Sequence, residues 1–396
     1  MRTIRTETAI IGGGLMGCWT AYHLRRRGRS VVVLEKGSVG AQASGVNYGN
    51  LRIQGRYLKQ IPLSLRAQEQ WEQLPALIGT DCEYLRTGHL YVGYNADQHD
   101  KLEHYAEESL ASGIDVEMLS TAEIAKRWPW LSGGPVAASY SPRCAVANPR
   151  LVTPAVARAA RQIGAEIYEG TKVISVEKTG TGFRVVTDRE LVIESDFLVN
   201  AAGAWALDIA KIFGETAPMF AAGPPQFVTE PLPYFMVPSV QLVDGVVICR
   251  QIPRGNVIVS GYPRGPSDPV ANRAPVPPAK TLATIARLVE VVPALVNTQV
   301  IRVWSGIEGY IMDMLPVLGP SATTERLIHA FGFCGHGFQL GPGVGQVLSE
   351  LIIDGATPTP LDAFAITRFA EGTSTASWRL KEEFDASLSS TPGATT

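Results

Sequence analysis

The sequence predicts an α/β fold (α+β overall) in two domains, and three observations carry this prediction. Residues 6–37 show strand, helix and strand patterns in the order of a βαβ unit. Helical and strand patterns alternate again over residues 151–206. From about residue 225 to 305, short strand candidates are separated by Pro-rich turns, which is typical of an antiparallel sheet. A chain of 396 residues is too long for one compact core and suits two domains.

The βαβ unit consists of three consecutive stretches. Residues 6–14, TETAIIGGG, are an apolar run that ends in glycines and predict a buried parallel strand. Residues 15–28, LMGCWTAYHLRRRG, place apolar side chains at helical spacing, and Gly28 ends the predicted helix. Residues 30–37, SVVVLEKG, predict a second buried strand. A right-handed crossover is expected for such a unit.

The remaining elements follow from the same periodicities. Helices are expected within residues 58–79, 97–112 and 341–352, and a helix followed by a strand within residues 151–178. Strands are expected within residues 88–94, 190–206, 246–251, 256–262 and 300–306. Residues 371–396 form a polar C-terminal tail, and we expect its final residues to be disordered.

Composition and charge narrow the functional class. The chain is 45% hydrophobic and carries a formal net charge of −2, which gives no electrostatic case for nucleic acid or an anionic membrane as a partner. Its five cysteines include no CxxC pair, so neither a disulfide framework nor a metal site is predicted. No segment approaches the roughly 20 apolar residues of a membrane span. The first strand begins too near Met1 for a signal peptide, and we therefore expect a soluble, cytoplasmic protein.

The first glycine loop has the spacing Gly12-x-Gly14-x-x-Gly17 and lies between the predicted strand and helix. In this context Gly12 allows a tight turn, Gly14 lets a pyrophosphate approach the backbone, and Gly17 lets helix and strand pack closely. Glu35, at the end of the second strand, is placed to accept hydrogen bonds from a ribose. The alternative is a glycine turn before an ordinary helix. The full βαβ context favours a dinucleotide, with candidate contacts at Gly12, Gly14, Leu15, Met16, Gly17, Glu35 and Lys36.

A second glycine-rich loop distinguishes between the dinucleotides. The acidic Glu35 disfavours a 2′-phosphate and leaves NAD and FAD. Residues 331–352, FGFCGHGFQLGPGVGQVLSELI, form an apolar run that turns helical, for which NAD offers no evident use. The pyrimidine edge of a flavin becomes negative on reduction, and a helix N-terminus would stabilise that charge. Gly335, Gly337 and Gly341 would then make the close approach, so the two loops together favour FAD over a simple glycine turn.

Several spaced motifs resemble the D-amino-acid oxidase superfamily, and the resemblance extends to about residue 355. Within it the chain is most similar to the sarcosine oxidase, glycine oxidase and amino-acid dehydrogenase flavoproteins. The motifs, in chain order, are IIGGGLMG, VLEKG followed by ASGVNYGN, GTKVISVE, FLVNAAGAWA, WSGIEGYIMDMLPVLG and GHGFQLGPGVG.

The resemblance implies a Rossmann-like FAD-binding domain assembled from residues 1–80, 145–225 and 310–370. A substrate domain with an antiparallel sheet over the flavin would comprise residues 81–144 and 226–309. The cysteine that tethers flavin in monomeric sarcosine oxidases aligns with Gly306, which implies non-covalent FAD. Further cofactor contacts implied by the resemblance are Ser44, Asn47, Val173, Ala202, Gly203, Gly335, His336, Gly337, Phe338 and Gln339.

The resemblance also implies a reaction: oxidation of a C–N bond by hydride transfer to flavin N5, followed by hydrolysis of the imine. Two familiar carboxylate-binding residues of the family are missing. Glu308 stands where glycine-oxidase-like members carry an arginine, and Gln339 where sarcosine-oxidase-like members carry a lysine. Glu308 has two interpretations: a structural acid paired with an arginine such as Arg302, or a carboxylate that favours a cationic amine, guanidinium amino acid or opine.

Arg250 is the candidate replacement for the carboxylate clamp, because a guanidinium can bind a carboxylate in bidentate fashion. The alternative is a surface arginine on a strand. Arg52, Tyr48 and Asn50, in the loop after the second strand, are further pocket candidates, and Gln339 adjoins the flavin-edge loop. Electrons would pass to oxygen or to an electron-transfer partner subunit of a hetero-oligomeric dehydrogenase. A non-catalytic FAD subunit and an NAD-linked dehydrogenase are the remaining hypotheses.

Overall fold

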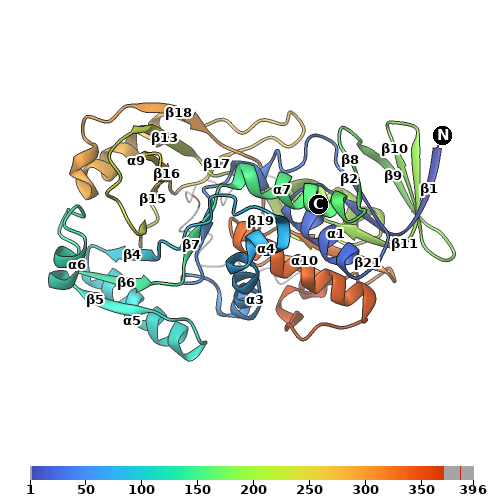
Figure 1. Ribbon diagram of the computed structural model, residues 1–396, viewed down its shortest axis with the longest axis horizontal. Helices are drawn as coiled ribbons and strands as arrows, with labels where there is room; N and C mark the ends of the chain where they lie inside the picture. The colour runs from blue at the N-terminus through green and yellow to red at the C-terminus, as the bar shows by residue number, and fades with distance from the viewer. Residues whose placement is uncertain (1, 370–383, 385–396) are drawn as a thin grey trace.

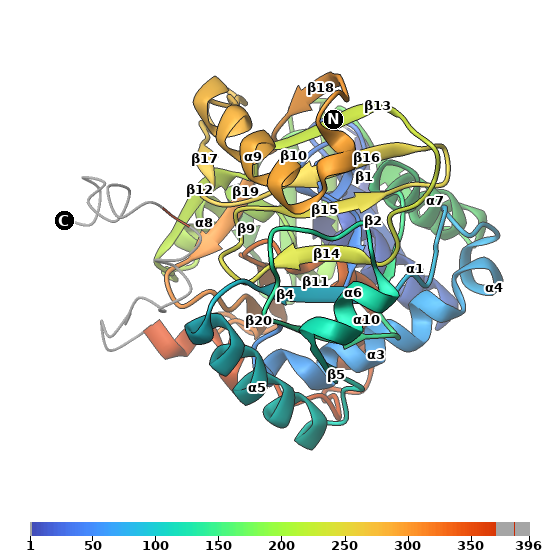
Figure 2. The same ribbon diagram turned by 90° about the vertical axis from the view of Figure 1, so that its left-hand side faces the viewer.

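The computed structural model describes residues 2–369 and residue 384. Two large sheets lie at opposite ends of the molecule, and helices α1 (Leu15–Arg26), α3 (Ile61–Glu72) and α10 (Gly337–Ile353) lie toward its middle (Figure 1). Seen from the end that carries the second sheet, helices α5 (Ala96–Ala111), α6 (Thr121–Arg127) and α9 (Pro278–Val291) face the viewer (Figure 2).

The first sheet has eight strands and is mixed. Its main path runs β20-β21-β11-β1-β2-β8, with β10 pairing β11 and β9 pairing β10. The pairs β1–β2, β1–β11, β11–β21 and β2–β8 are parallel. The strands are β1 (Arg2–Ile11), β2 (Val31–Leu34), β8 (Glu166–Tyr168), β9 (Val173–Lys178), β10 (Phe183–Thr187), β11 (Leu191–Asn200), β20 (Val317–Pro320) and β21 (Leu327–Phe331).

Both faces of this sheet are covered, because its buried strands carry apolar side chains on both sides. Helices α1, α10, α3 and α7 (Pro149–Gln162) enclose one core with the sheet, and β9, β10 and α8 (Ala206–Ile212) enclose a second on the other face. Glycines allow α10 to lie directly on α1. A Cβ at Gly341 would lie 2.5 Å from Leu15 Cδ2, and a Cβ at Gly345 would lie 2.5 Å from the Trp19 backbone.

The second sheet has the order β18-β13-β16-β15-β14-β4-β6-β5. All its pairs are antiparallel except β4–β14, which is parallel, so the predicted antiparallel sheet is mixed at this one pair. Strand β4 arrives from a separate part of the chain, which local patterns do not reveal. The strands are β4 (His89–Gly93), β5 (Glu117–Ser120), β6 (Ala137–Ser141), β13 (Gln226–Pro231), β14 (Ser239–Leu242), β15 (Ile248–Gln251), β16 (Asn256–Ser260) and β18 (Val300–Trp304).

Smaller elements join the two halves. Strand β12 (Met219–Gly223) pairs with β17 (Gly265–Pro266) and β19 (Glu308–Ile311), and β3 (Asn50–Leu51) pairs with β7 (Ala145–Val146). The short helices are α2 (Ala43–Val46) and α4 (Leu74–Ile78), with 3-10 turns at Leu58–Gln60, Gly203–Trp205, Pro293–Leu295, Asp362–Phe364 and Ile366–Phe369. In the described part of the chain, no helix combines the length and apolar character that a membrane crossing needs.

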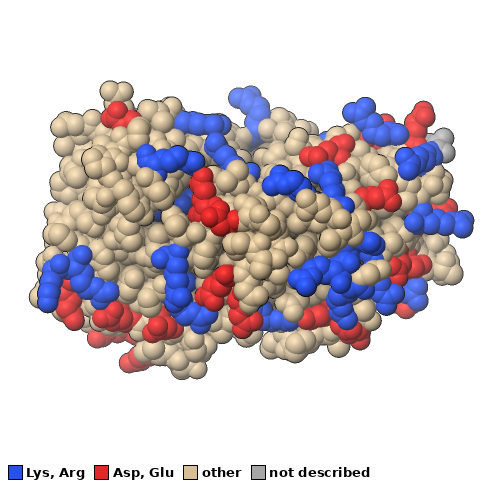
Figure 3. Space-filling view, viewed as in Figure 1, with Lys and Arg blue, Asp and Glu red and all other residues tan. Residues whose placement is uncertain are grey.

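The strands of the first sheet fall within residues 1–80, 145–225 and 310–370, and those of the second within residues 81–144 and 226–309. Helix α10 begins at Gly337, one turn earlier than the expected 341–352, and therefore includes Pro342. Residues 371–396, predicted as a polar tail, lie outside the described residues except for Phe384. Basic and acidic side chains are interspersed on the face shown in Figure 3, as the near-neutral composition implies.

Candidate active site

The first glycine loop is shaped by close backbone contacts. Gly12 has φ +112°, and a Cβ there would lie 2.3 Å from the carbonyl oxygen of Ala201 at the end of β11. A Cβ at Gly17 would lie 2.0 Å from the Gly12 carbonyl oxygen, so helix α1 packs directly on the loop. Gly17 therefore has the expected packing role, and Gly12 also lets β1 and the end of β11 approach each other.

The start of α1 leaves two backbone donors for an anion. The Leu15 N–H donates to Ser44 Oγ at 2.9 Å, so Ser44 already caps the helix. The N–H groups of Gly14 and Met16 donate to no acceptor within the described part of the chain. Helix N-terminal N–H groups attract negative charge, and a pyrophosphate at Gly14 and Met16 would satisfy both. This arrangement fits the phosphate end of a dinucleotide.

The ribose-side candidates are held by the same loop. Glu35 accepts hydrogen bonds from the Gly13 N–H at 2.8 Å and the Gly37 N–H at 2.7 Å, and each carboxylate oxygen retains a second lone pair. The Lys36 ammonium lies 3.0 Å from the centre of the Trp205 ring, where burial lowers its pKa. A carboxylate that also fixes the loop is already oriented when a ribose arrives.

The small-residue turn and the second loop after β2 adjoin the same place. The Ala202 Cα lies 3.2 Å from the Cβ position of Gly12, and Gly203 follows with φ +59°. Val173 begins β9, which pairs with β10 in the first sheet. The Asn47 side chain donates to the carbonyls of Ala43 and Ser44 and accepts from the Gly49 N–H. Asn47 therefore holds the loop in place through its own backbone.

Gly306 also meets this loop, at Val46. A Cβ at Gly306 would lie 2.0 Å from Val46 Cγ2, which leaves no room for a side chain at 306 unless Val46 moves. Val46 therefore fills the space beside residue 306, and non-covalent binding of FAD stays a prediction.

The second glycine loop lies against the first. A Cβ at Gly337, the first residue of α10, would lie 3.1 Å from Met16 Cε. Gly335 has φ +75° and faces Glu308 and Arg264. The expectation that Gly341 serves this loop is wrong, because its open side packs on α1. The starts of α1 and α10 are adjacent, as one cofactor held by both would require.

The side chains of the second loop are held by α3 and its neighbours. His336 is buried, with Nδ1 3.1 Å from Gln60 Oε1 and Nε2 3.3 Å from an Arg52 nitrogen, which agrees with a positional role rather than that of a base. Gln339 is fully buried and bonds Ser64 through both ends of its amide. Phe338 lies against Trp71, with ring centres 5.3 Å apart. Gln339 thus joins α10 to α3 rather than facing the second sheet.

One face of the second sheet is polar yet buried. Residues paired directly across strands point to the same face, and one set of such residues forms the apolar core with α6 and α9. The opposite set faces the first domain and is buried although polar: His89, Ser139, Ser141, Gln226, Ser239, Gln241, Arg250 and Ser260. A buried polar sheet face needs partners, so it marks where a polar ligand would bind.

Several polar atoms of this region have no partner within the described residues. They are the buried atoms Gln226 Oε1, His89 Nε2 and Ser141 Oγ on the sheet, and Tyr48 Oη and Asn50 Oδ1 on the loop below it. Native proteins satisfy nearly all buried polar atoms, so a polar ligand or ordered water would complete the hydrogen bonds of these five atoms. Burial of the phenol also raises the pKa of Tyr48 well above its ordinary value, so the hydroxyl stays protonated.

Arg250 connects the polar sheet face to the loop. Its Nε donates to the Tyr48 carbonyl at 2.9 Å and its Nη2 to the Ala147 carbonyl at 3.2 Å. The residue is only 5% exposed, so the alternative of a surface strand arginine is wrong. No described carboxylate lies within 4.0 Å of it, and burial lowers its pKa. A buried guanidinium whose five N–H groups make two hydrogen bonds is suited to receive an anion.

Glu308 lies on β19, near Gly335 of the second glycine loop. Its Oε2 accepts a hydrogen bond from the Tyr310 hydroxyl at 2.9 Å. The proposed pairing with Arg302 is wrong, because Arg302 lies on β18 beside Trp304. The arginine near Glu308 is Arg264: the Cβ position of Gly335 is 3.3 Å from its Nη2 and 3.8 Å from Glu308 Oε2. Arg264 follows β16 in a Pro-rich turn, where no sequence motif marks it.

Arg52 lies between the second glycine loop and the polar sheet face. Its Nη1 donates to the Gln54 carbonyl at 2.7 Å, and its guanidinium carbon is 6.0 Å from the Tyr91 ring centre. Together with its contact to His336, these interactions place Arg52 beside the second glycine loop and strand β4. That Arg52 and Tyr48 line the substrate pocket stays a prediction. Tyr91 lies on β4, and no sequence motif marks it as a site residue.

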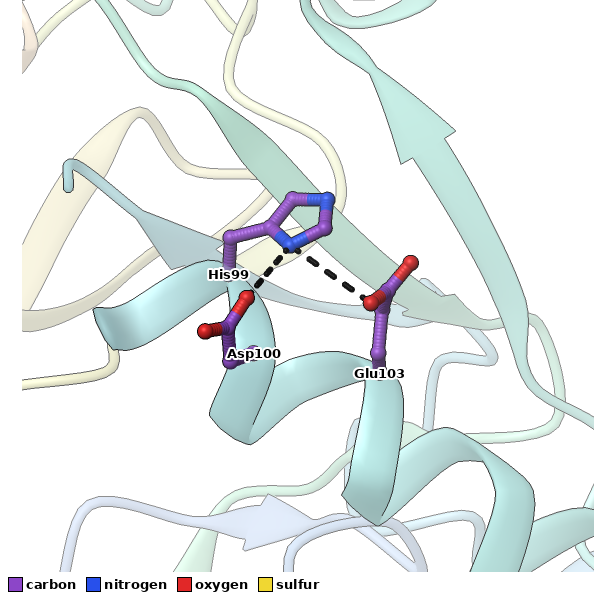
Figure 4. Close-up of side chains that lie close together, drawn as sticks. All are labelled: His99, Asp100 and Glu103. Carbon is purple, nitrogen blue, oxygen red and sulfur yellow. Dashed lines mark hydrogen bonds and ion pairs between the residues drawn. The ribbon is translucent and has the colours of Figure 1, made fainter. Parts of the chain in front are cut away.

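One cluster of metal-ligating side chains occurs elsewhere in the described residues. On α5, His99 Nδ1 is 3.3 Å from Asp100 Oδ1 and 3.7 Å from Glu103 Oε2 (Figure 4). The two carboxylates are exposed on the helix surface, and His99 and Glu103 have the spacing of four residues at which helix side chains pair readily. The group is remote in sequence from both glycine loops.

Because two glycine loops meet beneath a buried polar sheet face, fold and site together define a flavin-dependent oxidoreductase. Residues 7–351 match the DAO family, described as FAD dependent oxidoreductase, and the chain belongs to this family. The resemblance inferred from the motifs is therefore confirmed, and with it FAD as the cofactor and an FAD-dependent oxidoreductase as the class of protein.

Individual relatives are distant but aligned over most of the chain. The chain is 26% identical over 376 residues to glycine oxidase from Geobacillus kaustophilus (strain HTA426), covering 92% of this chain and 98% of that protein. It is 26% identical over 367 residues to the mitochondrial pyruvate dehydrogenase phosphatase regulatory subunit of Mus musculus, covering 89% of this chain but only 42% of that protein. The solved structure of L-proline dehydrogenase from P. horikoshii matches with TM-score 0.87 and 25% identity, covering 94% and 99% of the two chains.

Proposed function

We propose that the protein oxidises the C–N bond of an amino acid or N-substituted amino acid that carries a carboxylate. The observation that carries this proposal is Arg250, a buried guanidinium without a described carboxylate partner on a polar sheet face. A substrate carboxylate would complete its hydrogen bonds and neutralise its charge. The glycine oxidase and L-proline dehydrogenase similarities support the same class of substrate.

The chain's own residues would hold both the cofactor and the substrate. The Gly14 and Met16 N–H groups and Glu35 would bind the pyrophosphate and ribose, and the N-terminus of α10 would face the flavin. FAD, when bound, supplies the acceptor for a hydride from the carbon next to the substrate nitrogen. The chemistry therefore asks the protein mainly for orientation and a dry pocket.

Orientation follows from the polar groups around the site. Arg250 would bind the carboxylate, while Asn50 Oδ1 would accept a hydrogen bond from the amine. The Tyr48 hydroxyl, protonated because of its burial, would donate to or accept from the same substrate. The carbon that loses the hydride is then fixed between these groups and the flavin. The product imine would leave the pocket and react with water to give a carbonyl compound and an amine.

Glu308 supplies the second element of selectivity. The Glu308 carboxylate accepts a hydrogen bond from Tyr310 and would favour a substrate with a second, cationic group, such as a guanidinium amino acid or opine. Arg264 lies beside this carboxylate and offsets part of its charge. The substrate proposed is thus anionic at the Arg250 end and basic toward Glu308.

A second candidate concerns the electron acceptor. The matches to an L-proline dehydrogenase and to a glycine oxidase, each over nearly its whole length, support two alternatives: transfer of electrons to a partner subunit and transfer to oxygen. The partial match to a regulatory subunit supports the further hypothesis of a non-catalytic FAD protein. Mixing the reduced protein with oxygenated buffer distinguishes the two electron acceptors. Rapid reoxidation of the flavin identifies an oxidase, and slow reoxidation identifies a dehydrogenase that uses a partner subunit.

The proposed reaction is tested by anaerobic mixing of the FAD-loaded protein with amino acids, N-methyl amino acids and opines. We expect bleaching of the flavin absorbance by members that carry a carboxylate beside a secondary or primary amine. A flavin that none of these compounds reduces, although dithionite reduces it, contradicts the proposed oxidation.

A further inference from the structure

A pocket separate from the proposed active site lies behind the loop that follows β2. It has a volume of about 370 Å³ and is lined by residues 38–41, 45–46, 150, 154, 302, 304 and 305. Residues 38–46 form its floor, α7 one wall and the edge strand β18 the other. On the opposite side of the same loop, Ser44 contacts the end of the first glycine loop by accepting a hydrogen bond from the Leu15 N–H.

The Val46 carbonyl ties the pocket floor to two strands of the second sheet. Trp304 Nε1 donates to the Val46 carbonyl at 2.8 Å, and Gln226 Nε2 donates to the same oxygen at 2.9 Å. These two bonds fix the floor against the second sheet. A ligand in the pocket would therefore contact a loop shared with the cofactor site without entering the substrate site.

Two arginines converge on one tryptophan in this pocket. The guanidinium carbons of Arg150 and Arg302 lie 5.5 and 5.9 Å from the centre of the Trp304 ring. Neither side chain forms a salt bridge or hydrogen bond with any residue the structure describes. Burial and the charge of Arg302 lower the pKa of Arg150, as expected where two cations lie together without an acid.

We propose that this pocket binds a small phosphate ester, of about mononucleotide size, at Arg150 and Arg302. Two guanidiniums without acidic partners match the oxygens of a phosphate better than a single carboxylate, because each offers a fork of N–H donors. The volume exceeds what a single inorganic phosphate requires and lies in the range of pockets that hold whole small molecules. The Trp304 ring and Pro154 supply apolar surface for the remainder of the ligand.

Binding should be coupled to the cofactor loop. Gly40 donates its N–H to the Gly13 carbonyl, and Ser44 accepts from Leu15, so residues 38–46 contact both sites. Linkage requires that if the phosphate ester changes FAD affinity, FAD changes the affinity for the ester by the same factor.

The test is isothermal titration calorimetry of the FAD-loaded protein with AMP and with inorganic pyrophosphate. Saturable binding of at least one probe, at one site per chain, is expected. Arg150→Gln and Arg302→Gln should each weaken it by about tenfold or more. Arg287→Gln is the matched control, because Arg287 also stacks on an aromatic ring, Tyr94, but pairs with Glu290; it should bind as the wild type does.

Three outcomes contradict the proposal. The first is the absence of saturable binding of both probes. The second is unchanged affinity in Arg150→Gln and Arg302→Gln proteins that retain FAD and a normal melting temperature. The third is binding of a polyglutamate peptide with no binding of either phosphate probe, which would assign the pocket to an acidic protein partner.

Discussion

Replacing Arg250 with methionine tests the proposed orientation of the substrate. The guanidinium makes two hydrogen bonds to carbonyl oxygens, at 2.9 and 3.2 Å, and retains N–H groups for a ligand. Removing one partner of a buried, hydrogen-bonded charge pair costs about 2–4 kcal/mol, which corresponds to a roughly 30- to 1000-fold loss in kcat/KM. Methionine keeps most of the side-chain volume, so the loss reports chemistry more than packing.

The assay is anaerobic reduction of the flavin by the best substrate and by its methyl ester. Arg250→Met should lose the stated factor with the free acid and much less with the ester, because the ester has no carboxylate for the guanidinium to bind. Arg254→Gln is the control, since Arg254 is exposed and pairs with Glu83. Equal losses for acid and ester, or no loss in a protein with normal FAD content, refute the assignment of Arg250 to the substrate carboxylate.

The remaining predictions concern the cofactor loop, acid stability and the thiols. Gly17→Ala should lower the melting temperature by several degrees and weaken FAD binding, because the new Cβ would lie 2.0 Å from a backbone oxygen. Gly180→Ala is the control, because no atom lies within 4 Å of its Cβ position. In thermal melts and FAD titrations, the Gly180→Ala protein should behave as the wild type does. Burial alone would raise the pKa of Glu215, but hydrogen bonds, the largest from His329, hold it below its ordinary value of 4.5. The ionised Glu215 carboxylate therefore stabilises the fold above pH 4.5, and this stabilisation is lost as the pH falls below that value. Glu215→Gln should make the melting temperature depend less steeply on pH in the acidic range. An unchanged dependence on pH contradicts this prediction. Burial raises the pKa of Cys249 to about 12, so iodoacetamide should label none of the five buried cysteines in the native protein and all of them after denaturation, as mass spectrometry would show.

Local patterns were sufficient to predict the helices and strands that carry the two glycine loops. The βαβ unit, Gly17 and the helix after the second glycine loop depend on periodicity and spacing within about thirty residues, which is where such rules work best. That Gly337 adjoins Met16 follows only if one ligand joins the loops, and the structure places them together.

Residues whose roles depend on long-range packing could not be predicted. Gly341 is spaced like a loop glycine, but the close contact of α10 with α1 determines its role. Arg264 lies near Glu308 although it comes from a turn more than forty positions earlier, and the parallel pair β4–β14 joins segments about 150 positions apart. That Gln226 Oε1 and His89 Nε2 are buried without a described hydrogen-bond partner can be recognised only once the register of the second sheet is known.

The central claim is that a single flavin is held between the start of α1 and the start of α10. Titrating the cofactor-stripped protein with FAD, followed by ultrafiltration and measurement of bound flavin absorbance, tests it most directly. The account predicts one tightly held FAD per chain in the wild type, and a large loss of retained flavin in both Gly17→Ala and Gly337→Val. A protein that stays colourless after soaking, or retention that is unchanged in the Gly337→Val protein, would contradict it.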